Sequence, residues 1–273
     1  MEELARAKVN LLLRVLRRRE DGFHEIETLM VPIALHDSIE IEPANSFQFH
    51  CNEGELAGDD NLVVRAARLF FFETKREPKV RLTLQKRIPH GAGLGGGSSD
   101  AAATLRALNC FFDAAIPNEK LQELAAQLGS DVPFFLDSGA AICSGRGEVV
   151  TPMTLPTRLN LLLLKPDFGI ASSWAYSRWR ANRESTDPTY QPEKFGELTL
   201  INDLERGVFE KFIFLAQLKA WLRNQAEVGA ALMSGSGSTI FAVMRTGTNA
   251  ELVAKRAQSE VDPELWSCAC QTI

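Results

Sequence analysis

Residues 89–100 read PHGAGLGGGSSD and hold five of the 19 glycines of the chain within twelve positions. Residues 80–88 alternate between apolar and polar side chains, which predicts a strand, and residues 101–112 have the apolar spacing of a helix. A glycine turn that leads into a helix N-terminus presents several backbone N–H groups to one point, where the helix dipole adds partial positive charge. Small side chains let the backbone close around phosphate oxygens. The segment therefore predicts a phosphate-binding loop, and a flexible linker is disfavoured because a strand and a helix adjoin it directly.

The side chains at the end of this loop support the same interpretation. Ser98 and Ser99 carry hydroxyls that can bond a phosphate or Mg²⁺, and Asp100 favours the start of a helix. A Walker loop is excluded, because it requires a lysine directly after the last glycine and the chain has Ser98 there.

A dinucleotide-binding loop is also disfavoured. Gly91, Gly93 and Gly96 match the spacing G-x-G-x-x-G, and Asp113 lies near the distance expected of a carboxylate that binds ribose. That aspartate ends a predicted helix instead of a second strand, however, so the required strand–helix–strand unit is missing.

Composition narrows the class of protein. The 273 residues include 30 Lys and Arg against 35 Asp and Glu, a net charge of −5, which argues against a nucleic-acid partner. The apolar runs at 9–16 and 159–164 are interrupted and fall well short of the roughly 20 residues of a membrane helix. Five cysteines without a C-x-x-C pair indicate a reducing compartment instead of a disulfide framework or a metal site. We therefore expect a cytoplasmic protein without a membrane partner.

Periodicity predicts an α+β fold in two parts. Pro152 and Pro156 predict a linker, so we expect domains at 1–152 and 153–273. An Asp-Gly turn near residue 21 predicts that the chain starts with a hairpin. The predicted strands lie at 8–19, 23–33, 37–42, 47–51, 80–88, 159–164, 229–233, 239–244 and 266–272, the helices at 61–74, 101–112, 118–128, 173–180, 215–225 and 249–260, a short helix after 130, and a loop at 183–196.

Four separated blocks of the chain resemble the GHMP superfamily of small-molecule kinases, which includes galactokinase, homoserine kinase and mevalonate kinase. The blocks are AKVNL at 7–11 with DGFHE at 21–25, the glycine segment at 89–100, GSDVP at 129–133, and MSGSGSTIF at 233–241. DNLV at 60–63 and NDLE at 202–205 are also similar. The likeness spans nearly the whole chain. The DGFHE block and the triple glycine resemble the branch of the family that acts on a CDP-linked methylerythritol in non-mevalonate isoprenoid synthesis.

This resemblance implies a fold and a reaction. The fold would be a ribosomal-protein-S5-domain-2-like N-terminal domain and a ferredoxin-like C-terminal α/β sandwich, with the active site in the cleft between them. The reaction would transfer the γ-phosphoryl group of ATP, with Mg²⁺, to a tertiary hydroxyl of the acceptor. Asp131 would be the general base, and Lys8 would stabilise charge on the attacking oxygen and the γ-phosphate. Judged without the resemblance, Asp131 is an N-cap before Pro133, and Lys8 is an ordinary strand-edge lysine.

The resemblance also implies binding residues. Asn10 would contact the acceptor, Phe23 and Tyr176 would sandwich the cytosine ring, and His24 would read its polar edge. Gly235 and Gly237 would form a second glycine turn that supports the phosphate loop and the acceptor. The residues implied for ATP binding are Asn61, Lys86, Pro89, His90, Gly91, Ala92, Gly93, Leu94, Gly95, Gly96, Gly97, Ser98 and Ser99.

Several alternatives stay open at this stage. The acceptor could be homoserine or a mevalonate derivative, because only the acceptor end of the site separates these kinases. A nucleotide-binding regulator without catalysis is a third interpretation, against which the presence of both Lys8 and Asp131 argues. No protein ligand for Mg²⁺ is assigned beyond the two serines, and both a monomer and a homodimer are compatible with the sequence.

Overall fold

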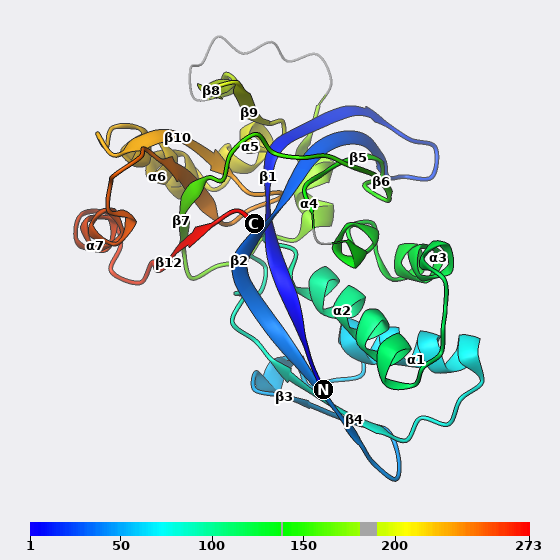
Figure 1. The fold of residues 1–273 in the computed structure, drawn as a ribbon. Coiled ribbons are helices and arrows are strands. Elements are labelled where there is room, and N and C mark those ends of the chain that lie inside the picture. Colours follow the sequence, from blue (N-terminus) through cyan, green and yellow to red (C-terminus); the bar gives the residue numbers. More distant parts are fainter. Residues whose placement is uncertain (138, 181–189) are drawn as a thin grey trace.

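A hairpin of two long strands forms the spine of the protein, in a computed structural model that describes residues 1–137, 139–180 and 190–273. Strand β1 (Glu2–Arg18) pairs antiparallel with β2 (His24–Pro43), as Figure 1 shows in blue. The sequence predicted separate strands at 23–33 and 37–42. They are one strand, because β1 begins at Glu2 and its first residues extend the ladder to Glu40 of β2.

The first sheet draws strands from both halves of the chain. Its order is β3-β4-β2-β1-β9-β8, with β5 paired to β2 and β6 to β5. The prediction of a loop at 183–196 was wrong at its end, where β8 lies; residues 183–189 of that loop lie outside the described residues. Because β9 pairs with β1, strands from both sides of the predicted boundary at 152/153 share this sheet, and the boundary stays a prediction. The bounds are β3 (Gln48–Cys51), β4 (Val80–Gln85), β5 (Ala141–Gly145), β6 (Val149–Pro152), β8 (Glu193–Phe195) and β9 (Leu198–Asn202).

Helices of the N-terminal half cover one face of this sheet. Their buried side chains form a core with those of β2 and β4. The helix predicted at 101–112 begins earlier, at Gly96, because the amide of Ser99 already donates to the carbonyl of Gly95. Two glycines of the phosphate loop therefore belong to the first helical turn. The elements are α1 (Leu62–Thr74), α2 (Gly96–Phe111), α3 (Asn118–Leu128) and the 3₁₀ helices η1 (Gly54–Leu56) and η2 (Pro133–Leu136).

A second sheet, ordered β10-β11-β7-β12, lies between the first sheet and helices of the C-terminal half. In β7, Leu161 and Leu163 pack toward the first sheet, while Leu162 and Leu164 pack toward α6 and α7. A strand that is buried on both faces has apolar side chains at successive positions, as residues 161–164 do. The elements are β7 (Asn160–Lys165), α4 (Ser172–Arg178), α5 (Glu205–Phe209), α6 (Ile213–Arg223), β10 (Val228–Met233), β11 (Ile240–Met244), α7 (Ala250–Glu260) and β12 (Trp266–Gln271).

Across the described ranges of the chain, no helix is both long enough and apolar enough to cross a bilayer.

Candidate active site

A cleft of about 1100 Å³ brings together segments that are far apart in the sequence. The hairpin β1–β2, the glycine loop, the segment around residue 131, α4 and the turn after β10 all contribute to its wall. Ser99 and Gly237 are the predicted site residues outside the lining. The side chain of Ser99 is buried in α2, and Gly237 packs against Met233 and Ile170. The predicted residues that line the cleft are Lys8, Asn10, Phe23, His24, Asn61, Lys86, residues 89–98, Asp131, Tyr176 and Gly235.

The glycine loop requires its glycines for backbone conformation and for contact with the second glycine turn. Gly91, Gly93 and Gly95 have positive φ angles of 63°, 73° and 73°. A Cβ atom on Gly93 would overlap the carbonyl oxygen of Ser234 and lie 2.9 Å from that of Gly237. The loop therefore reaches its position only because its backbone packs directly on the backbone of the turn.

Hydrogen bonds join the same two turns. The amides of Ser238 and Thr239 donate to the carbonyls of Gly91 and Ala92, at 3.3 and 3.2 Å. The hydroxyl of Ser234 donates to the carbonyl of Gly93 at 2.9 Å. These bonds hold the glycine loop and the N-terminus of α2 in the wall of the cleft, and backbone amides at a helix start can bind phosphate.

Lys8 and Asn10 face the cleft because side chains alternate along β1. Ala7, Val9 and Leu11 point to the other face and pack against the second sheet. The ammonium of Lys8 donates to Oδ1 of Asn10 at 2.5 Å and to the carbonyl of Gly93 at 2.8 Å. Lys8 is thus fixed against the phosphate loop by its own strand and by a residue 85 positions away.

A second contact orients Asn10. Its Nδ2 donates to the hydroxyl of Thr28 at 2.8 Å, and that hydroxyl donates to the carbonyl of Leu12 at 2.6 Å. Asn10 therefore presents its oxygen to Lys8. Sequence reasoning missed Thr28, whose role depends on the register of β1 and β2.

Asp131 lines the cleft near Lys8, in the segment before η2. The expectation that it is an N-cap was wrong, because Val132 occupies that position and no side chain caps the helix. Within the described part of the chain its carboxylate has no hydrogen-bond partner, and it is close enough to Lys8 to act on its charge. Burial lowers the pKa of Lys8, and the negative charge of Asp131 opposes this shift. A carboxylate without a partner beside a buried ammonium can accept a proton from a bound hydroxyl.

Aromatic side chains line the cleft near the turn of the β1–β2 hairpin, where His24 pairs with Arg18, away from Lys8 and the glycine loop that it contacts. The rings of His24 and Tyr176 are stacked, with centroids 5.5 Å apart, and Trp179 meets His24 edge-on at 5.7 Å. The guanidinium of Arg146 lies 4.8 Å from the centre of the Phe23 ring. Sequence reasoning missed Trp179 and Arg146. Trp179 follows Tyr176 by one helical turn, a spacing that could have pointed to it, but no local pattern marks Arg146.

The surroundings of His24 bear on the protonation of its ring. Burial lowers the pKa of His24, and the positive charge of Arg18 lowers it further. Both effects favour a neutral imidazole at neutral pH, with one ring nitrogen as donor and the other as acceptor.

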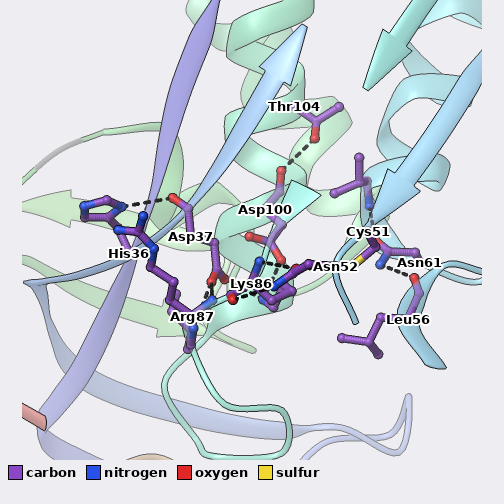
Figure 2. Close-up of polar contacts among 12 residues, drawn as sticks. His36, Asp37, Cys51, Asn52, Leu56, Asn61, Lys86, Arg87, Asp100 and Thr104 are labelled. Atoms are coloured by element: carbon purple, nitrogen blue, oxygen red, sulfur yellow. Dashed lines mark hydrogen bonds and ion pairs between the residues drawn. The ribbon is translucent and has the colours of Figure 1, made fainter. Parts of the chain in front are cut away.

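Lys86 and Asn61 line the cleft, yet their polar atoms also bond to the protein. The ammonium of Lys86 contacts Oδ2 of Asp37 at 2.5 Å and Oδ2 of Asp100 at 2.8 Å, as Figure 2 shows. Asn61 caps α1 by accepting from the amide of Val63 at 2.8 Å. Lys86 and Asn61 therefore both line the cleft and stabilise its wall.

Asp100 departs from the expected role at the start of α2. Gly95 is the N-cap, and Asp100 lies one turn inside the helix, buried beside Lys86. Burial raises the pKa of Asp100 to about 7, Lys86 opposes the shift, and Asp37 adds to it. Its Oδ1 has no hydrogen-bond partner among the described residues.

The side chains near the glycine loop offer few ligands to a divalent cation. Among residues 1–137, 139–180 and 190–273, no three His, Cys, Asp or Glu side chains lie together as a metal site. Ser98 does line the cleft in the first turn of α2. A hydroxyl beside bound phosphate oxygens suits Mg²⁺, which keeps several waters and takes few protein ligands.

Two family models match the chain: the GHMP kinases N terminal domain over residues 61–139 and the GHMP kinases C terminal domain over residues 191–262. A protein named 4-diphosphocytidyl-2-C-methyl-D-erythritol kinase from Methylacidiphilum infernorum is 40% identical over 255 residues, covering 89% of this chain and 86% of the relative. One of the same name from Chloroherpeton thalassium is 35% identical over 277 residues, covering 95% and 96%.

Solved structures of kinases are also similar to this chain. A crystal structure of 4-(cytidine 5'-diphospho)-2C-methyl-D-erythritol kinase is similar with a TM-score of 0.81 and 35% identity, covering 100% of this chain and 99% of that one. A homoserine kinase from Cytophaga hutchinsonii has a TM-score of 0.72 at 15% identity, covering 100% and 94%, and shows the fold alone.

Proposed function

Because the chain belongs to the GHMP kinase family, and within it to the 4-diphosphocytidyl-2-C-methyl-D-erythritol kinases, we propose that it phosphorylates the 2-hydroxyl of 4-diphosphocytidyl-2-C-methyl-D-erythritol with ATP. The observation that carries the assignment of its site is one cleft with a phosphate-binding helix N-terminus at one end and stacked aromatic rings at the other. Lys8 and Asp131 line the cleft between these ends.

Phosphoryl transfer needs positioning and charge stabilisation more than covalent catalysis. The acceptor hydroxyl oxygen forms a bond to the γ-phosphorus while the bond from that phosphorus to the β-phosphate oxygen of ATP breaks. Asp131 takes the proton of the hydroxyl as its oxygen becomes bonded to phosphorus. The ammonium of Lys8 stabilises the negative charge on the attacking oxygen and the γ-phosphate. Asn10 and the carbonyl of Gly93 hold that ammonium in place.

The loop and the start of α2 bind the triphosphate through backbone amides. Positive φ angles at Gly91, Gly93 and Gly95 turn the backbone around the phosphates, and the dipole of α2 adds positive charge. Bound Mg²⁺ would neutralise charge on the phosphate oxygens, and Ser98 is the protein group that we assign to it. The assignment rests on the position of Ser98 in the cleft lining.

The aromatic end binds the cytidine. Phe23 and Tyr176 supply apolar surfaces for stacking, which tolerates any base, so hydrogen bonds must select cytosine. His24, with one donor and one acceptor nitrogen, is the group that we assign to this selection. Its contacts with Tyr176 and Trp179 fix the plane of its ring.

We also propose that the protein works in the cytoplasm. All five cysteines are free thiols, which suits a reducing compartment.

An ATP-consumption assay with Mg²⁺ and three acceptors tests the proposed function. The acceptors are 4-diphosphocytidyl-2-C-methyl-D-erythritol, homoserine and mevalonate, and phosphorus NMR identifies the product. A new phosphomonoester on the methylerythritol unit alone is the expected result. Turnover of another acceptor would assign a sister activity, and ATP binding without any turnover would make the protein a regulator. Chelation of Mg²⁺ with excess EDTA is expected to abolish turnover.

Phe23→Ala is expected to weaken CDP binding about tenfold, because it removes one stacking surface worth roughly 1–3 kcal/mol. Isothermal titration with CDP measures the effect, and titration with ADP is the control, since the adenosine end of the cleft is untouched. If the wild-type protein shows no affinity for CDP, the assignment of the aromatic end is wrong. Equal CDP affinity of the variant and the wild type would remove Phe23 from the cytidine site.

A further inference from the structure

Two buried ion clusters, each built around one lysine and two carboxylates, lie behind the two glycine turns. In each, one lysine contacts two carboxylates that come from different elements. Lys86 joins Asp37 of β2 to Asp100 of α2, and the three side chains are 7%, 0% and 3% exposed. Lys219 of α6 joins Glu205 of α5 to Glu193 of β8, at 2.7 and 3.5 Å, and these are 1%, 3% and 13% exposed. Neither cluster is part of the reaction described above.

The first cluster holds the entry to the phosphate loop. Asp37 contacts Lys86, and its Oδ1 accepts hydrogen bonds from the backbone amides of Arg87, labelled in Figure 2, and of Ile88. Arg87 and Ile88 lie in the short segment that connects β4 to the glycine loop. A Cβ atom on Gly96 would lie 3.2 Å from Nζ of Lys86 and 3.0 Å from the side chain of Ile88. The cluster thus lies directly against the first turn of α2, whose amides bind the nucleotide phosphates.

The second cluster holds the turn that supports Lys8. Oε1 of Glu205 accepts the amide of Met233 at 2.8 Å, one residue before the turn. Asn202, three residues before Glu205, donates to the carbonyls of Met233 and Gly235 at 2.8 and 2.7 Å. A Cβ atom on Gly235 would lie 3.1 Å from Nζ of Lys8.

The carbonyl of Gly93, in the phosphate loop, connects the turn to Lys8. Ser234 fixes the carbonyl of Gly93, which accepts the ammonium of Lys8. Glu205 therefore reaches Lys8 through Met233, the turn and Gly93, without touching the cleft itself.

We propose that the two clusters are separate positioning devices: Asp37 and Lys86 set the helix end of the phosphate loop for nucleotide binding, and Glu205 and Lys219 set the turn that aligns Lys8 for catalysis. The inference rests on the proposed function for the identity of the two ligands. Removing the charge of Asp37 leaves Lys86 paired with Asp100, and removing the charge of Glu205 leaves Glu193 in contact with Lys219 and Arg223, so each buried lysine keeps an acidic partner. We therefore expect the fold to survive while the turn loses its anchor.

The test uses the matched variants Asp37→Asn and Glu205→Gln of the full chain. Each keeps its shape and removes one negative charge. For Asp37→Asn we expect the Kd for ADP to rise about tenfold, as the loss of charge-assisted hydrogen bonds predicts, with kcat at saturating ATP within about threefold of wild type. For Glu205→Gln we expect kcat to fall about tenfold with the Kd for ADP within about twofold. Titration with ADP and steady-state kinetics with 4-diphosphocytidyl-2-C-methyl-D-erythritol give the two readouts.

The outcomes separate this inference from the proposed function. A wild-type protein that binds ADP and does not phosphorylate the acceptor contradicts the proposed function, and the ADP arm of Asp37→Asn still tests the first cluster. The positioning roles are overturned in two cases, both with an active wild-type kinase. In the first, both variants change Kd and kcat by the same factors; in the second, neither variant changes Kd or kcat.

Thermal melting monitors folding. If either variant loses cooperative melting, Asp100→Asn or Glu193→Gln takes its place, because each removes one charge from the same cluster. The same split between Kd and kcat is then required.

Discussion

Asp131→Asn is expected to lower kcat by about 10²–10⁴-fold, the range that a positioned general base contributes. Asparagine has nearly the same size as aspartate and keeps one carbonyl oxygen, but it cannot take the proton of the acceptor hydroxyl. The carboxylate of Asp131 has no hydrogen-bond partner in the described part of the chain, so the substitution breaks no structural bond. Affinity for ADP is expected to stay within about twofold of wild type, because the phosphates bind to the loop amides.

Single-turnover kinetics with saturating ATP measure this effect on the chemical step, and titration with ADP measures binding. Asp137→Asn is the control, since Asp137 is an exposed aspartate six residues further along that does not line the cleft. Unaltered turnover in Asp131→Asn would exclude the residue as the base. A loss of ADP affinity as large as the loss of kcat would assign Asp131 to binding.

Gly93→Ala is expected to lower the free energy of unfolding by about 3 kcal/mol and to abolish detectable ADP binding. Two effects add. The φ angle of 73° costs a residue with a Cβ about 1–2 kcal/mol. The added methyl group would overlap the carbonyl of Ser234, so the loop and the turn must separate, at a typical cost of about 1–3 kcal/mol. Separation also moves the carbonyl that holds Lys8.

Urea denaturation and titration with ADP measure the two effects of Gly93→Ala. Gly247→Ala is the matched control, because Gly247 has a φ angle of 77° and nothing within 4 Å of its added Cβ. The control isolates the conformational cost, and we expect it to bind ADP like the wild type. If Gly93→Ala behaves like the control, backbone packing between the two turns does not hold the phosphate loop in place.

Local sequence patterns predicted most of the helices and strands. The glycine segment before an apolar-spaced helix predicted a phosphate-type loop at a helix N-terminus, and the structure has that geometry. The Asp-Gly turn near residue 21 predicted the β1–β2 hairpin. The resemblance of four blocks to GHMP kinases predicted the family and the fold, and both are confirmed. The glycine loop and the hairpin depend on residues within one or two turns of each other, where spacing and turn chemistry are sufficient.

Predictions from local sequence were wrong where contacts with distant residues or the backbone conformation of a neighbour determined the structure. Asp100 has the side chain of a helix-capping residue, but the positive φ of Gly95 starts the helix earlier and leaves Asp100 inside it. Residues 193–195 follow a polar segment and carry little strand signal, yet they pair with β9 at the edge of the first sheet. The strand is stabilised by its partner more than by its own composition.

The sequence by itself determined most of the helices, most of the strands and the glycine turns, because these follow from the spacing of apolar residues and the conformational freedom of glycine. It did not predict β5, β6, β8, β9 or α5. Only the tertiary structure decided which side chains meet. Lys8 contacts the carbonyl of Gly93, Arg146 lies over Phe23, and Glu205 anchors the turn behind Lys8 through Met233. Each of these contacts joins residues 28 to 123 positions apart. No local pattern encodes them, because they arise from the packing of whole elements and from the register between strands.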